Sequence, residues 1–334
     1  MFKPLLLAAS LALAVTPSLA DEVNVYTSRQ PDLIQPIFDA FTATSGITVN
    51  VLYSEKGLIE RLKAEGKRSP ADLYITSDIA NVKAATDAGL TQPHGSDVVD
   101  AVVPADLRDA GGHWFALTTR ARVVYASKER VAEGAVTTFE DLVDPKWKGR
   151  ICTRPGSHYY NLALIAAVIA HHGPEQARVW VRGLKANLAR TPQGNDRAQV
   201  KAVWAGECDI AIGNTYYMGK MLEEPEQRPW AESVNVVFPV FEGGGAHVNI
   251  SGAAVTNSSP NHDAAMQLVA FMLSEQAQKL YAELNYEYPV RAGVAPSALV
   301  AGWGSFEADT IPLTQIGELR GEALKIVEET GFDN

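Results

Sequence analysis

Strand-like and helix-like apolar patterns alternate along the chain, and this alternation constrains the fold more than any other feature. After a short strand pattern at residues 23–26, apolar side chains recur at helical spacing across 31–44, and residues 47–53 alternate as a strand. The same order continues with a helix at 58–65, a strand at 72–76 and a helix at 79–88. A βαβαβα order predicts a parallel sheet with helices on its faces.

A second region of the chain repeats this order. It predicts a strand at 150–154, helices at 159–171, 174–187 and 196–205, a strand at 208–212 and a helix that begins at residue 216. Two further strand-like runs, at 114–127 and 234–241, lie outside these units and are candidates for crossings between lobes. We therefore predict an α/β fold in which two lobes, joined by two extended crossings, enclose a cleft.

The boundaries of the two lobes follow from these elements. We assign residues 21–120 and about 244–295 to an amino-terminal lobe, and residues 121–243 and about 296–334 to a carboxy-terminal lobe. A chain of 334 residues is also longer than one hydrophobic core comfortably serves. Ligands of open α/β sheets bind beyond the carboxyl ends of the strands, beside helix N-termini, so we expect the cleft to be the binding site.

The first twenty residues have the pattern of a secretory signal peptide. Lys3 gives a short positive segment, residues 5–15 are apolar, and Ser18-Leu19-Ala20 is a small-x-small cleavage site. We expect the mature chain to begin at Asp21 and to act in the periplasm. An uncleaved anchor is the alternative interpretation, although the apolar run is shorter than the ~18 residues of a membrane span.

The net charge limits the kinds of partner, and the cysteine spacing limits the kinds of site. The formal net charge is −10 at pH 7, which disfavours nucleic acid and anionic lipid as partners and chiefly serves solubility. Cys152 and Cys208 are the two cysteines, and their spacing is not that of a metal site. In an oxidising compartment we expect them to form a disulfide, with a free buried pair as the alternative.

Two tyrosine pairs occupy matching positions in the second region. Gly213-Asn214-Thr215-Tyr216-Tyr217 follows a short apolar strand and opens a helix. Tyr159-Tyr160 follows the strand at 150–154 and also opens a helix. Both strand-to-helix turns therefore present phenols at the carboxyl edge of the predicted sheet, where a ligand would bind.

Clustered phenols indicate one kind of ligand. Fe³⁺ is a small, highly charged cation that favours anionic oxygen donors, and a tyrosine, with a pKa near ~10, becomes such a donor when the metal displaces its proton. Three phenolates would balance the charge of the ion but leave part of an octahedral shell open. A small bidentate anion such as carbonate could fill it, held by Arg29, Arg120 or Arg122. The alternative is that the tyrosine rings simply pack.

Six segments together resemble the periplasmic ferric-binding proteins of bacterial ABC iron importers, which have the type II periplasmic binding-protein fold. These segments are 25–31, 69–72, 118–123, 185–190, 213–217 and 283–290. The resemblance implies that Tyr216, Tyr217 and Tyr160, rather than Tyr159, bind iron. Some members carry a histidine ligand where this chain has Gln30, and an acidic ligand that has no clean match near residues 77–78.

Without these two ligands, the chain resembles the branch of the family that uses three tyrosines and an exogenous anion. The resemblance then implies that Arg29, Gln30 and Arg120 contact the anion, and that a monomeric protein delivers Fe³⁺ to an inner-membrane permease. A rival hypothesis is a binding protein for a phosphonate, a polyamine or thiamine, with the aromatic rings stacked on the ligand. A hydrolase is the third, but the sequence shows no Gly-x-Ser-x-Gly elbow or nucleophile–base pair, so we do not expect an enzyme.

Overall fold

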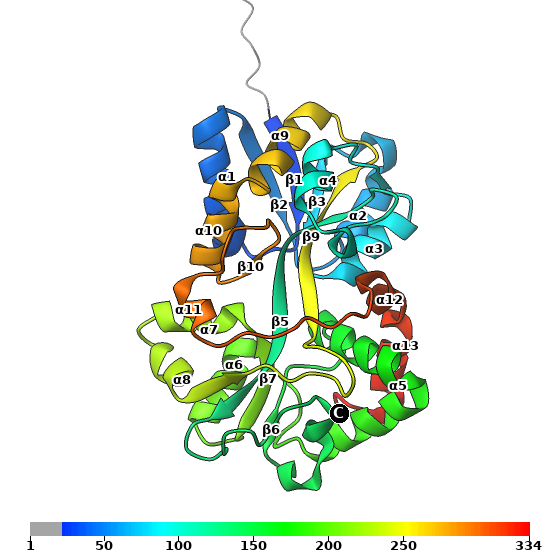
Figure 1. Cartoon of the computed structure of the whole chain (residues 1–334). Coiled ribbons are helices and arrows are strands. Elements are labelled where there is room, and N and C mark those ends of the chain that lie inside the picture. The colour runs from blue at the N-terminus through cyan, green and yellow to red at the C-terminus, as the bar shows by residue number, and fades with distance from the viewer. Residues whose placement is uncertain (1–21) are drawn as a thin grey trace, which may run out of the picture.

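The computed structural model describes residues 22–334 (Figure 1). The predicted signal peptide and Asp21 lie outside the described residues. Within the described part of the chain, no helix is long and apolar enough to cross a membrane.

The first region folds as its apolar patterns predict. β1 (Glu22–Thr27) lies between β2 (Thr48–Tyr53) and β3 (Leu73–Thr76) and is parallel to both. The connections between these strands are α1 (Pro31–Ser45) and α2 (Leu58–Glu65), and α3 (Ile79–Asp87) follows β3. Leu33, Ile34, Ile37, Phe38 and Phe41 form the buried face of α1, which explains why helical spacing identified this element.

The second region also follows the predicted order. β6 (Ile151–Cys152) is parallel to β7 (Ile210–Asn214). The helices are α5 (Tyr159–Ala186), α6 (Asp196–Trp204), α7 (Tyr216–Glu223) and α8 (Arg228–Glu232). The two helices predicted at 159–171 and 174–187 are the two halves of α5, which Gly173 interrupts with non-helical angles of φ 80° and ψ 165°. Pro174 directly after this glycine cannot continue the hydrogen-bond ladder of the first half.

Two long strands join the regions into one sheet. β5 (Phe115–Ser127) pairs with β9 (Val248–Thr256) through residues 115–121 and with β7 through residues 122–126. β9 in turn pairs with β3. Figure 1 shows β5 and β9 running side by side through the middle of the molecule, between an upper and a lower group of helices. The sheet order is β2-β1-β3-β9-β5-β7-β6.

The predicted crossing at 234–241 is wrong. β8 (Val234–Val237) runs antiparallel to residues 124–127 of β5, so it belongs to the lower part of the sheet, and β9 is the second crossing. The apolar run of 234–241 identified a strand, but an apolar run carries no information about which strand is its partner. β9 contains Asn249, Ser251 and Gly252, and this polar and flexible composition hid it.

The remaining elements are two short strands of the sheet, six further helices and several 3₁₀ turns. β4 (Thr91–Gln92) pairs with β9, and β10 (Tyr288–Pro289) pairs with β5. The other helices are α4 (Asp97–Val102), α9 (His262–Met272), α10 (Glu275–Asn285), α11 (Ala298–Ala301), α12 (Leu313–Glu318) and α13 (Arg320–Thr330). Short 3₁₀ turns occur at Gly66–Arg68, Ala105–Leu107, Glu140–Val143 and Pro145–Trp147.

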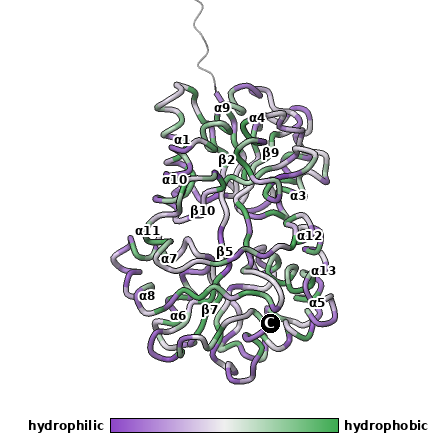
Figure 2. Tube along the Cα trace, viewed as in Figure 1, coloured by the Kyte–Doolittle hydropathy of each residue, from purple (hydrophilic) through white to green (hydrophobic). Residues whose placement is uncertain are grey.

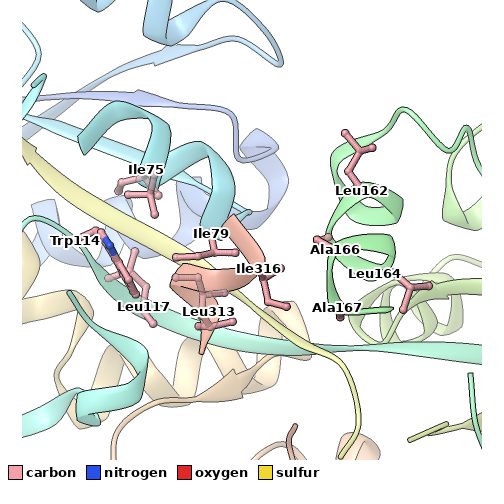
Figure 3. Packing of buried hydrophobic residues seen from close by; sticks show 14 of the residues in the cluster. Ile75, Ile79, Trp114, Leu117, Leu162, Leu164, Ala166, Ala167, Leu313 and Ile316 are labelled. Atoms are coloured by element: carbon pink, nitrogen blue, oxygen red, sulfur yellow. The ribbon is translucent and has the colours of Figure 1, made fainter. Parts of the chain in front are cut away.

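The carboxy-terminal helices touch both groups of helices. α12 packs against α3 and α5, and α13 packs against α5. Figure 3 shows Leu313 and Ile316 beside Ile79, the first residue of α3. The end of the chain therefore connects the upper and lower regions along one flank.

Hydrophobic burial is interrupted at the junction of the two regions. β7 is buried along its whole length, and the surrounding trace is largely hydrophobic in Figure 2. The middle of β5 is hydrophilic in the same view, and there Arg120 and Arg122 are only 1% and 2% exposed. Charged side chains are rarely buried this deeply without partners, so this part of β5 marks a polar centre.

Candidate metal centre

A cavity of about 860 Å³ opens between the two regions and contains all three predicted tyrosine ligands. The first region contributes Arg29 and Gln30 to its wall, and the second contributes Tyr160, Tyr216 and Tyr217. Gln30 directly precedes α1, whereas the tyrosines lie in the first turns of α5 and α7. The cavity therefore lies at helix N-termini beyond the carboxyl ends of strands, as the fold predicts.

The tyrosines of the two turns converge. The phenol oxygens of Tyr160 and Tyr216 are 2.7 Å apart, within hydrogen-bond distance. The rings of Tyr216 and Tyr217 have centroids 4.3 Å apart and planes inclined by 35°. Because β6 and β7 are parallel neighbours, the helices that follow them begin side by side, which places these phenols together.

Tyr159 has a different position from its neighbour. Its phenol oxygen lies 3.4 Å from the hydroxyl of Ser77, which belongs to the other side of the cavity. Its ring stands edge-on to that of Tyr160, with centroids 4.5 Å apart. Tyr160 is thus the member of the pair that meets Tyr216, and Tyr159 forms a contact across the cleft.

Arginine side chains surround the tyrosine rings. The guanidinium carbons of Arg120, Arg122 and Arg154 lie 5.2, 5.7 and 5.0 Å from the ring centroid of Tyr160. The guanidinium carbon of Arg29 lies 5.9 Å from the centroid of Tyr216. Cations near ring faces interact favourably with the aromatic quadrupole, and they also stabilise negative charge on the phenol oxygens.

A buried carboxylate holds two of these arginines. Asp196 accepts from Arg122 at 2.7 Å and from Arg154 at 2.5 Å, and its side chain is fully buried. Arg122 also donates to the side-chain oxygens of Asn161 and Asn214, at 2.6 and 3.0 Å. Arg122 and Arg120 both line not the large cavity but a narrow space of about 10 Å³ beside Tyr160.

Arg29 and Arg120 each have hydrogen-bond donors without an acceptor in the described part of the chain. Arg29 pairs with buried Glu287 at 2.5 Å and donates to Ser251 at 2.7 Å, and its Nε has no partner among the described residues. Arg120 donates to the backbone oxygen of Ser77, and its Nε and Nη1 likewise have no partner there. The Nε atoms of Arg122 and Arg154 also lack a partner within residues 22–334, and of these four arginines only Arg29 and Arg154 line the large cavity. Buried donors without acceptors are costly, so an acceptor beside them would be favourable.

The surroundings shift the acidity of the phenols in opposite directions. Burial, together with the neighbouring Tyr160, raises the pKa of Tyr216 and Tyr217 well above the usual value. Burial alone would also raise the pKa of Tyr160, but nearby Arg120 and the hydrogen bond with Tyr216 outweigh it and lower this pKa. The site therefore places one phenol with a lowered pKa beside two phenols with raised pKa values.

The predicted disulfide is confirmed. Cys152 in β6 bonds to Cys208, which precedes β7, with their Cα atoms 5.9 Å apart. Both cysteines are buried, in the same hydrophobic cluster as the three tyrosines. Elsewhere, residues 22–334 include no group of three His, Cys, Asp or Glu side chains that could hold a metal ion.

Sequence reasoning missed Asp196 and Arg154 as parts of this centre. Asp196 is the first residue of a helix that the sequence does predict, α6, but its partners lie 42 and 74 positions away. An aspartate at a helix start ordinarily complements the helix dipole, so no local signal separated this one from a solvated acid. Arg154 is the last residue of the strand predicted at 150–154 and was not among the expected anion contacts.

Comparison with known proteins identifies the family. Residues 37–308 match the bacterial extracellular solute-binding proteins. The chain belongs to this family. Among relatives of this solute-binding protein, iron uptake protein A1 of Synechocystis sp. is 43% identical over 96% of this chain and 90% of its own length.

Solved structures agree with this placement. The apo ferric ion-binding protein A of Pasteurella haemolytica superposes with a TM-score of 0.91 at 48% identity, covering 94% of this chain and 99% of that one. A Trichodesmium protein solved in complex with iron and citrate ligands gives a TM-score of 0.87 at 40% identity, covering 93% and 99%. The predicted two-lobed α/β fold of this solute-binding protein is therefore confirmed.

Proposed function

We propose that this solute-binding protein captures Fe³⁺ with the phenolates of Tyr160, Tyr216 and Tyr217 together with a small anion. The observation that carries the proposal is the 2.7 Å approach of the Tyr160 and Tyr216 oxygens at the wall of the cavity, with the Tyr217 ring beside them. Relatives named for iron uptake and ferric ion binding support the choice of cation.

The charges in the site suit a trivalent ion. Three phenolates neutralise Fe³⁺, and the pKa shifts of Tyr216 and Tyr217 mean that the ion itself must displace their protons. A bidentate anion of the carbonate or carboxylate class completes the shell. Arg29 and Gln30 line the same cavity as the tyrosines and can contact this anion. Arg120 lines the adjoining narrow space and has an Nε and Nη1, unpartnered among the described residues, for an acceptor, while Asp196 fixes the position of Arg122.

The protein's role is then capture and delivery without chemistry on the ion. We propose that it works in the periplasm as a monomer and passes its cargo to the membrane permease of an ABC importer. The family of extracellular solute-binding proteins supports this setting. Residues of both lobes line the cavity, so a change in lobe angle opens or closes access to the tyrosines.

A thermal-shift comparison tests the proposal against an organic ligand. Ferric citrate should raise the unfolding midpoint, because a ligand at about 100 times its Kd adds about 2.7 kcal/mol to stability. Citrate alone, an aminophosphonate, spermidine and thiamine should leave the midpoint unchanged. Stabilisation by an organic ligand without any response to ferric citrate would overturn the proposal.

A further inference from the structure

Tyr286 has an unusual backbone conformation. It follows the last residue of α10 with φ 58° and ψ 34°, and it is the one non-glycine residue in 22–334 with positive φ. Helices often end in this left-handed conformation, but usually at a glycine, because a side chain is disfavoured there. A bulky residue in this place requires a compensating contact.

The compensating contact is with α7, the helix that carries Tyr216 and Tyr217. A Cβ atom added at Gly219 would lie 2.1 to 2.6 Å from three ring carbons of Tyr286, so the aromatic ring occupies the place of a side chain there. The Tyr286 hydroxyl donates to Glu223 at the end of the same helix, at 2.7 Å. Tyr286 as a whole is 9% exposed.

The neighbours of Tyr286 hold the other side of the cleft. The Asn285 side chain donates to the backbone oxygen of Leu33 in α1 at 2.6 Å. Glu287, fully buried, pairs with Arg29 at 2.5 Å. Residues 285–287, which we call the interlobe strap, therefore join α1, α7 and Arg29 through three consecutive side chains.

We propose that Tyr286 is a positioning residue that fixes α7, and with it Tyr216 and Tyr217, relative to Arg29 on the opposite lobe. This inference rests on the proposed function of the three tyrosines. The strap connects the two sides of the site through a ring-to-backbone contact at Gly219 and an ion pair, both buried. Metal sites tolerate small errors in ligand placement poorly, so a displaced α7 weakens binding without removing any ligand.

Adding one methyl group to α7 tests the contact. Gly219→Ala should accelerate transfer of iron to a competing chelator by about 10- to 100-fold, the effect usual for outer partners of metal ligands, and should shift the visible absorption band of the complex. Gly321→Ala is the matched control, because Gly321 lies in α13 and a Cβ there meets no atom within 4 Å. If both variants behave as wild type, the proposal is wrong.

A double-mutant cycle separates the ring contact from effects within α7. In a Tyr286→Ala background, Gly219→Ala should cause no further acceleration, because the ring that opposes the methyl group is gone. An undiminished effect there would overturn the proposal. This background also covers the case in which Gly219→Ala alone fails to fold.

Scattering by the iron-free proteins distinguishes this inference from the proposed function. Small-angle X-ray scattering should show an altered distance distribution for Gly219→Ala and an unchanged one for Gly321→Ala. If wild type binds no iron, the proposed function fails, and the scattering comparison still tests the strap. Identical scattering curves for wild type and Gly219→Ala would contradict the positioning role.

Discussion

The phenol oxygens of Tyr160 and Tyr216 lie 2.7 Å apart although the two residues are separated by 56 positions in the chain. Cys152 and Cys208, which form the disulfide, have the same separation. The unit of β6 and α5 and the unit of β7 and α7 therefore lie side by side with matching positions along their lengths. The disulfide joins their strands, and the phenols of Tyr160 and Tyr216 meet at the starts of their helices. This arrangement explains how one lobe alone assembles the tyrosines.

Removing the disulfide should destabilise the protein strongly. The double variant Cys152→Ala, Cys208→Ala should lose about 4 kcal/mol of unfolding free energy, because the crosslink closes a long loop in the unfolded chain. Urea denaturation of wild type and variant measures the difference. An unchanged midpoint and slope would show that the bond contributes nothing to stability.

Asp196→Asn should also lower the free energy of unfolding, but through the loss of a buried ion pair. The substitution leaves the buried guanidiniums of Arg122 and Arg154 without their shared carboxylate, which should cost about 3–5 kcal/mol. Glu175→Gln, which alters an exposed ion pair with Arg178, is the control and should leave the denaturation midpoint in place. Equal effects of the two substitutions would refute the supporting role of Asp196.

Iron binding should weaken as the pH falls. The raised pKa values of Tyr216 and Tyr217 mean that both phenols are protonated in the iron-free protein, so binding releases protons and acid favours the empty state. The apparent affinity should fall up to about tenfold per pH unit for each proton released. Competition with a chelator between about pH 6 and pH 8 measures this slope.

A tyrosine variant assigns the released protons. Tyr217→Phe should reduce the slope of log affinity against pH by about one proton, since one titrating phenol is absent. Tyr26→Phe is the control, because Tyr26 bonds to Glu65 and lies outside the cavity wall. A pH-independent affinity in wild type would rule out phenolate ligands.

Much of the fold could be predicted because local patterns determine local elements. The helices at 31–44 and 58–65 followed from apolar spacing. The predicted parallel pairing is confirmed for β1 with β2 and β3 and for β6 with β7, whereas β5 and β9, which join the two regions, pair antiparallel with their neighbours, so the sheet is mixed. The pairing of strands that are far apart in the chain was harder to predict from the sequence. The prediction gave the second crossing to residues 234–241 and did not identify β9 as a strand, because partner choice depends on tertiary contacts and not on the apolar character of a strand.

The candidate site could likewise be predicted only in part. Tyr160, Tyr216 and Tyr217 stand at strand-to-helix turns, where sequence alone indicates a ligand edge, and the structure brings all three to one cavity. The network of Asp196 with Arg122 and Arg154 could not be predicted, because its members are far apart in the chain and each has an ordinary local role. In the folded protein, Asp196 holds Arg122 and Arg154 beside the ring of Tyr160.

The visible absorption spectrum of the iron-loaded protein tests the central claim most directly. Fe³⁺ added with bicarbonate should produce a phenolate-to-iron charge-transfer band, which Tyr160→Phe, Tyr216→Phe and Tyr217→Phe should each weaken or shift, while lowering affinity by more than about 100-fold. Tyr26→Phe should keep the wild-type band. A wild-type protein without such a band, or a Tyr216→Phe variant with the band unaltered, would contradict the account.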